Sequence, residues 1–183
     1  PCGTANIYLD VSGSMNNEDK IDQAIEAAQA FIDSIDSNSR IGLATFSTDL
    51  EIRVPLDDYE GAQQALTDEI QSLVAEGGTE LFGAVTDVVD YMNRQTVSDR
   101  IRAVVLLSDG ADTGNKGFTL NDAIAALEAS RGDLNPVILI PVAYGSDADI
   151  NALNALARAS ATRVQSGDPS SIVSVLELIS SYF

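Results

Sequence analysis

Short apolar runs and amphipathic stretches follow one another along the whole chain. The apolar runs predict six β-strands at residues 5–9, 40–46, 50–54, 103–107, 136–143 and 163–165. Between them, apolar residues recur every three or four positions and predict helices from about residue 20 to 35 and over 59–73, 81–93, 120–130, 149–159 and 170–183. This alternation predicts an α/β fold: a doubly wound, mostly parallel six-stranded sheet with helices on both faces.

Three details of the pattern refine the predicted sheet. Only a few residues separate the second strand from the third, which is too short a link for a crossover, so this pair should be an antiparallel hairpin at the sheet edge. The run 103–107 is apolar at every position, which is typical of a central strand buried on both faces. Pro141 interrupts the run 136–143 and predicts a strand end or a bulge, because proline has no N–H to donate.

The length of the chain favours a single domain. Its 183 residues are 45% hydrophobic, contain no internal repeat or Pro/Gly linker, and can bury a substantial core, so residues 1–183 should form one domain. No apolar run approaches the roughly 18 residues needed to cross a bilayer, so no direct membrane insertion is expected. The chain begins at Pro1 rather than Met, and we interpret it as part of a longer protein with other domains.

Charge and composition exclude several functions. The formal net charge of −18 repels phosphate backbones, so nucleic-acid binding is not expected. The chain has no His and a single Cys, which excludes Ser–His–Asp and Cys–His nucleophiles and the usual Cys/His zinc sites. The sequence leaves two alternatives for Cys2: a disulfide with a cysteine elsewhere in a longer chain, or a free thiol.

Small oxygen-bearing side chains stand at the ends of two predicted strands and at the start of a helix. Asp10, Ser12 and Ser14 lie on the turn that follows the first strand. Asp109 follows the fourth strand, and Thr79 comes after two glycines, just before a helix. In an open α/β sheet, ligands bind at the carboxyl ends of the strands. Oxygen donors of this kind suit Mg²⁺, with Mn²⁺ or Ca²⁺ as alternatives.

The first motif has a simpler interpretation when it is taken by itself. A Ser/Gly turn with Asp10 as a helix cap would have the same sequence. The second carboxylate changes the balance. Two carboxylates about 5 Å apart repel by roughly 3 kcal/mol at an effective dielectric constant of about 20, and a divalent cation reverses the sign of this interaction.

The three sequence motifs together resemble a known family. Asp10-x-Ser12-x-Ser14, followed by Gly78-Thr79 and Asp109-Gly110, resembles the metal-ion-dependent adhesion site (MIDAS) of von Willebrand factor A (VWA) domains. The likeness covers essentially the whole chain and implies the Rossmann-like VWA fold. It implies that Ser12 and Ser14 bind the metal directly and that Asp10 lies beside it, directly or through water. Thr79 would bind directly in the ligand-ready state, and Asp109 through water.

The resemblance also implies a partner and a location. One coordination position would stay open for an Asp or Glu carboxylate of a protein partner. Segments 142–149 and 167–169 resemble envelope-associated bacterial members, which implies an extracellular or cell-envelope location. Gly83 departs from the family, since many relatives carry Asp in the corresponding stretch, and this puts the support of the ligands in question. Asp112 is expected to be a solvated loop charge rather than a ligand.

The leading hypothesis is therefore a divalent-metal-dependent protein-interaction module of the adhesion type, without catalysis. A first alternative is a metal-dependent hydrolase or phosphatase with Asp10 as nucleophile. Such enzymes usually place a second Asp two residues later as the acid/base, and Ser12 holds that place here. A second alternative is a structural domain with a vestigial metal site.

Overall fold

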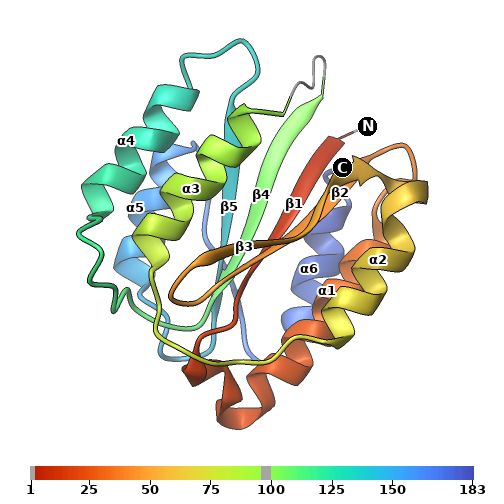
Figure 1. Ribbon diagram of the computed structural model, residues 1–183, viewed down its shortest axis with the longest axis horizontal. Helices are drawn as coiled ribbons and strands as arrows, with labels where there is room; N and C mark the ends of the chain where they lie inside the picture. The colour runs from red at the N-terminus through yellow and green to blue at the C-terminus, as the bar shows by residue number, and fades with distance from the viewer. Residues whose placement is uncertain (1–2, 96–99) are drawn as a thin grey trace.

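The computed structural model describes residues 3–95 and 100–183 and shows a six-stranded sheet of order β3-β2-β1-β4-β5-β6 (Figure 1). Neighbouring strands are parallel except β2 and β3, which form the predicted antiparallel edge hairpin. Cys2 lies outside the described residues. The strands are β1 (Gly3–Asp10), β2 (Arg40–Phe46), β3 (Leu50–Asp58), β4 (Ile101–Ser108), β5 (Val137–Tyr144) and β6 (Gln165–Gly167).

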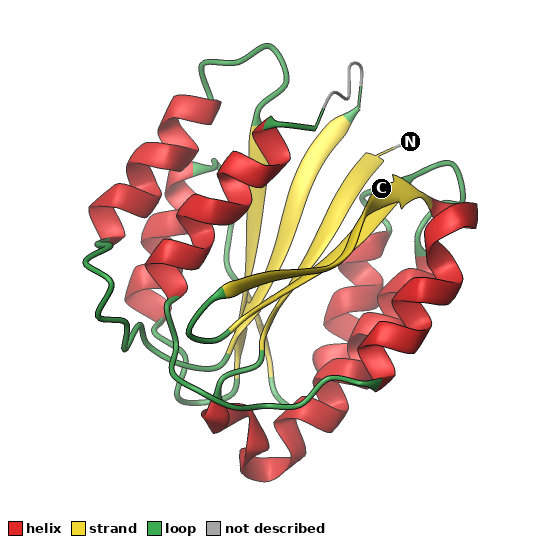
Figure 2. Cartoon of the chain, viewed as in Figure 1, coloured by secondary structure: helices red, strands yellow, loops and turns green. Residues whose placement is uncertain are grey.

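Helices cover both faces of the sheet, as predicted (Figure 2). Helices α1, α2 and α6 bury their apolar side chains in one core, and α3, α4 and α5 bury theirs in a second core on the other face. The helical elements are η1 (Gly13–Asp19), α1 (Lys20–Ser34), α2 (Tyr59–Gln71), α3 (Leu81–Asn93), α4 (Leu120–Ser130), α5 (Ile150–Ala159) and α6 (Ile172–Ser180).

The strand order places a topological switch point between β1 and β4. From β1 the chain continues to β2 on one side, whereas β4 and β5 follow on the other side, so the connections leave in opposite directions. Such a switch point is where open α/β sheets bind ligands. Leu9 pairs with Leu107 in the parallel register, so β1 and β4 end side by side at Asp10 and Ser108.

Three strand predictions need correction. The third strand runs to Asp58 instead of ending at residue 54, because its pairing with β2 continues to that residue. The last strand is Gln165–Gly167 rather than 163–165, because its pairing with β5 begins only at Gln165. Pro141 marks neither a strand end nor a bulge: it lies inside β5, in an unbroken register with Leu106 of β4. The other neighbour of β5 pairs only with Val142–Tyr144. On that side Pro141 needs no ladder hydrogen bond, and proline is therefore tolerated there.

The start of β1 and the C-terminus lie close together, at the end of the molecule opposite the carboxyl ends of β1 and β4 (Figure 1). Phe183 is buried and contacts Phe31 of α1, with the ring centroids 6.2 Å apart. A Cβ at Gly3 would lie 2.4 Å from Phe183 Cδ1, so only glycine allows this close approach. The last residue therefore fastens α6 to the start of β1.

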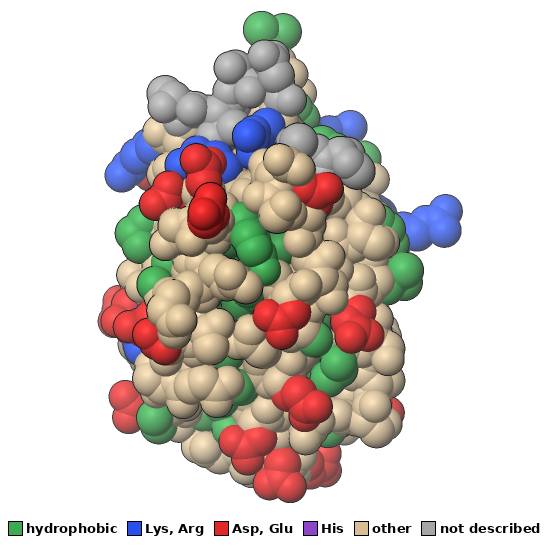
Figure 3. Space-filling view, turned by 90° about the vertical axis from the view of Figure 1, so that its right-hand side faces the viewer, with side chains coloured by type: hydrophobic (Ala, Val, Ile, Leu, Met, Phe, Trp, Pro, Cys, Tyr) green, Lys and Arg blue, Asp and Glu red, His purple; other side chains and the backbone are tan. Residues whose placement is uncertain are grey.

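The surface carries the negative charge that the composition predicts. Figure 3 shows acidic side chains spread over the side of the molecule where α1 and α2 lie, while most basic side chains in this view are near its upper end. Among the described residues, no helix is both long enough and apolar enough to cross a membrane.

We expect Phe31→Ala to lower the free energy of unfolding by about 3–5 kcal/mol, because it removes a fully buried ring and leaves a cavity between α1 and α6. Urea denaturation measures this loss. Glu26→Ala, on the exposed side of the same helix, should change it by less than about 0.5 kcal/mol. Equal losses in the two variants would contradict the described packing.

Candidate metal centre

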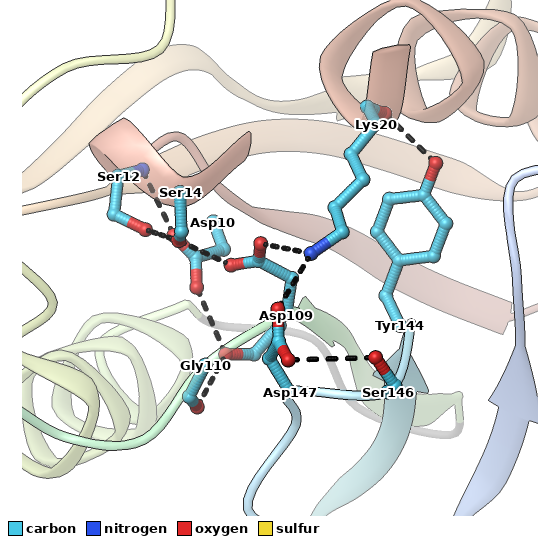
Figure 4. A network of polar contacts seen from close by, with 10 residues as sticks. Asp10, Ser12, Ser14, Lys20, Asp109, Gly110, Tyr144, Ser146 and Asp147 are labelled. Atoms are coloured by element: carbon cyan, nitrogen blue, oxygen red, sulfur yellow. Dashed lines mark hydrogen bonds and ion pairs between the residues drawn. The ribbon is translucent and has the colours of Figure 1, made fainter. Parts of the chain in front are cut away.

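Asp10 ends β1 and is completely buried (Figure 4). Its Oδ1 accepts a hydrogen bond from the Ser12 backbone N–H at 2.9 Å, within its own turn. Its Oδ2 accepts from the hydroxyl of Ser108, the last residue of β4, also at 2.9 Å. The carboxylate is thus fixed by the turn after β1 and by the end of β4, and each oxygen retains a second lone pair.

The hydroxyls of Ser12 and Ser14 connect this carboxylate to the second one. Their oxygens lie 3.1 Å apart, and Ser14 donates a hydrogen bond to Asp109 Oδ1 at 2.7 Å. Four of the five residues expected at the metal, namely Asp10, Ser12, Ser14 and Asp109, therefore form one hydrogen-bonded network, in which the backbone N–H of Ser12 provides the link to Asp10. Asp109, like Asp10, is completely buried.

The backbone brings the loop of Thr79 to the same place. Gly13 N–H donates to Gly77 O at 3.0 Å, which joins this loop to the turn after β1. Thr79 and Thr113 join it to the loop after β4, since Thr79 N–H donates to Thr113 Oγ1 at 3.0 Å and Thr113 N–H donates to Thr79 O at 2.8 Å. Among the described residues, the hydroxyl of Thr79 makes no hydrogen bond to the other four expected ligands. Its direct role at a metal stays a prediction.

Sequence analysis missed a charged residue in this network. Lys20, the first residue of α1, has a side chain only 1% exposed, and its Nζ lies 3.0 Å from Asp109 Oδ2 and 3.4 Å from Asp147 Oδ2. The hydroxyl of Tyr144 donates to the Lys20 carbonyl at 2.9 Å. A lysine that opens an amphipathic helix is normally exposed, so the sequence pattern gave no signal of burial.

The buried charges of the site do not balance. Asp10 and Asp109 supply two carboxylates, whereas Lys20 supplies one buried ammonium. Burial raises the pKa of Asp10 to about 6, even though hydrogen bonds from Ser12 and Ser108 favour its charged form. Burial opposes the charge on Lys20, but its hydrogen bonds and ion pairs with Asp109 and Asp147 outweigh this effect and raise its pKa. One negative charge remains uncompensated.

A hard divalent cation fits this donor set. Among residues 3–95 and 100–183, no three His, Cys, Asp or Glu side chains come together, so hydroxyls would have to complete the coordination. Oxygen donors with few charges suit Mg²⁺, which keeps several waters when it binds to proteins. The uncompensated negative charge gives the cation an electrostatic reason to bind.

Two neighbouring residues have structural roles. Asp112, expected to be a solvated charge, instead accepts hydrogen bonds from the backbone N–H groups of Phe82 at 3.1 Å and Gly114 at 3.2 Å, and so holds the start of α3 to its loop. A Cβ at Gly83 would lie 3.0 Å from Phe118 Cδ2. The Phe118 ring therefore crowds this position, and a larger side chain there would require the ring to shift.

The geometry is unfavourable for Asp10 as a nucleophile. A buried carboxylate with both oxygens hydrogen-bonded is poorly disposed to attack a phosphate ester that arrives from solvent. The residue two positions later is Ser12, which has no acid/base group of suitable pKa. The arrangement presents acceptor oxygens to a cation and resembles a binding site more than a hydrolytic one.

Comparison with known proteins identifies a family and curated relatives that match part of the chain. A family model for the von Willebrand factor type A domain matches residues 7–111. The curated "Calcium-activated chloride channel regulator 1" of Mus musculus is 25% identical over 139 residues, which are 75% of this chain and 15% of that protein. This chain thus spans only a small part of its curated relative.

Solved structures with the same fold include bacterial proteins. The von Willebrand factor type A protein of Catenulispora acidiphila superposes with a TM-score of 0.83 at 21% identity, over 98% of this chain and 42% of that one. The vWF domain of the type V pili tip protein Mfa5 from Porphyromonas gingivalis gives a TM-score of 0.77 at 14% identity, over 99% and 94%. With the family model matching more than half of its residues, the chain belongs to the von Willebrand factor type A domain family.

Proposed function

We propose that this domain is a protein-interaction module of the adhesion type that binds its partner through a divalent metal ion. Asp10, Ser12, Ser14, Thr79 and Asp109 would hold Mg²⁺, with Mn²⁺ or Ca²⁺ as alternatives. An Asp or Glu of the partner would complete the coordination. The observation that supports this proposal is the hydrogen-bonded network of Asp10, Ser12, Ser14 and Asp109, in which both carboxylates are buried and one negative charge is uncompensated.

The residues of the site would have different roles in binding the metal ion. The hydroxyls of Ser12 and Ser14 are neutral oxygens that already lie side by side, so they can approach a cation without adding charge. Asp10 is fixed by Ser108 and does not need to reorganise. When bound, Mg²⁺ supplies an electron-poor centre with exchangeable positions, to which a carboxylate binds well.

Exposed acidic residues around the site restrict the choice of partner. Glu18 and Asp19 lie on η1, between the serines and Lys20; Glu76 lies on the Thr79 loop, and Asp147 contacts Lys20. These charges would repel an isolated acidic segment within the Debye length of about 8 Å. The partner would therefore present its carboxylate between basic residues, and complex formation should weaken as the salt concentration rises.

The relatives support a location outside the cytoplasm. One similar structure is a domain of a pilus tip protein. We accordingly propose that this domain acts at the cell surface or in the cell envelope, as one domain of a longer chain and without catalysis.

Isothermal titration calorimetry with MgCl₂ tests the proposed site directly. We expect the wild type to bind one Mg²⁺, and Ser12→Ala and Thr79→Ala each to weaken binding by at least about tenfold, the scale for losing an interaction with a charged group. Ser146→Ala is the matched control, because this hydroxyl lies near the site but, within the part of the chain that the structure describes, hydrogen-bonds only to Asp147.

The wild-type titration also distinguishes the alternatives. If the wild type binds no magnesium, the result would contradict the proposal and favour a structural domain with a vestigial metal site. Magnesium-dependent hydrolysis of p-nitrophenyl phosphate that disappears in Asp10→Asn would favour the phosphatase alternative instead.

We expect Asp10→Asn to stabilise the protein in a metal chelator at pH 7.5 by up to about 3 kcal/mol. The reason is that ionised Asp10 opposes folding: with a folded pKa of about 6 against an ordinary value of 3.8, its contribution to stability is lost as the pH rises through this range. The amide Oδ1 can still accept from Ser12, and its NH₂ can donate to Ser108.

Urea denaturation at two pH values measures this effect. The advantage of the Asp10→Asn variant should shrink to about half at pH 5, where wild-type Asp10 is largely protonated in the folded state. A destabilised variant at pH 7.5, or an advantage that does not change with pH, would show that buried charge is not the cause.

A further inference from the structure

Lys20 brings a positive charge into a site that is expected to bind a cation. Its ammonium is held in place on several sides: Asp109 and Asp147 accept its hydrogen bonds, and a Cβ at Gly145 would lie 3.1 Å from Lys20 Cε. Gly145 has a φ of +80°, so glycine is required there for its backbone as well as for this close approach. The position of the ammonium is therefore well defined.

Such an ammonium cannot be a metal ligand, since it has no lone pair to offer. Next to the site, it repels any divalent cation and makes a carboxylate that it binds less available. A buried lysine next to the site is therefore not expected if tight metal binding is the only property that the site requires. Its presence therefore points to another property of the occupied site.

We propose that Lys20 is the charge-balancing residue of this metal centre: its ammonium weakens binding of the divalent ion and selects an anionic group from the partner. This inference rests on the proposed function. Asp10 and Asp109 together cancel the charge of Mg²⁺, and Lys20 then leaves the occupied site with one net positive charge. The carboxylate of the partner neutralises that charge, so metal and partner bind better together than either binds alone.

Asp147 partly offsets the positive charge of Lys20 but does not cancel it. Its side chain is 67% exposed, and solvent screens its charge more than that of Asp109, which is completely buried. Figure 4 shows the Asp147 carboxylate next to the Lys20 ammonium, with the second oxygen directed toward Ser146. Neutralising Lys20 and neutralising Asp147 should therefore shift metal affinity in opposite directions, although neither side chain is an expected ligand.

Calorimetric titration of the variants with MgCl₂ tests the proposal. Lys20→Met should bind Mg²⁺ at least about tenfold more tightly than the wild type, because a buried unit charge near the ion is removed. Asp147→Asn should bind it about two- to threefold more weakly, since the charge removed is exposed. Lys116→Met, at the only other lysine, is the matched control and should leave the affinity unchanged.

A second measurement separates charge selection from simple packing. NMR titration of the magnesium-saturated proteins with acetate should show at least about fivefold weaker acetate binding in Lys20→Met than in the wild type. Loss of packing would weaken the binding of both magnesium and acetate. Charge balancing instead requires that Lys20→Met bind magnesium more tightly and acetate more weakly than the wild type.

The outcomes are distinct. If wild-type protein binds no Mg²⁺, the proposed function and this inference are both wrong. If wild-type protein binds Mg²⁺ but folded Lys20→Met binds it no more tightly, or binds acetate equally well, only the charge-balancing role is wrong. If Lys20→Met fails to fold without metal, Asp147→Asn decides: weaker magnesium binding supports the role, and unchanged or tighter binding overturns it.

Discussion

The burial of Asp10 and Asp109 at the ends of neighbouring strands is the constraint on which the rest of this structure depends. An ionised carboxylate removed from water is costly unless hydrogen bonds and opposite charges surround it. The backbone N–H of Ser12 and the hydroxyl of Ser108 donate hydrogen bonds to the Asp10 carboxylate. The hydroxyl of Ser14 and the ammonium of Lys20 donate hydrogen bonds to the Asp109 carboxylate. The first turn of α1 and the turn after β1 are thereby drawn to the same point.

The sheet topology explains why this constraint arises here. β1 lies in the middle of the sheet beside β4, and the connections that follow these two strands leave in opposite directions from their carboxyl ends. Loops from three parts of the chain can therefore meet there. The hydrogen bond between Gly13 and Gly77 and the pair between Thr79 and Thr113 join them through their backbones, so the side-chain oxygens are placed by rigid neighbours.

Sequence reasoning recovered the elements whose signal is local. Apolar runs and helical periodicity gave the sheet class and the helices, and the position of each motif after a strand brought Asp10 and Asp109 to one end of the sheet. The prediction of a strand end or bulge at Pro141 was wrong because a proline inside β5 is tolerated only where the neighbouring strand β6 does not pair with it. The local sequence pattern contains no information on how far β6 extends. Lys20 was missed for a similar reason: its burial is decided by Asp109 and Asp147, residues distant in sequence, and not by the helix that it opens.

The contact between Phe183 and Gly3 has a mechanical consequence. It places the start of β1 and the C-terminal residue at the end of the molecule farthest from the proposed metal centre (Figure 1). A polypeptide joined before β1 or after Phe183 would therefore extend from that end, and the proposed metal centre would face away from it. Tension applied between a tether and a bound ligand would then run lengthwise through the parallel strands, and both ends would share one anchoring point instead of being pulled apart across the sheet.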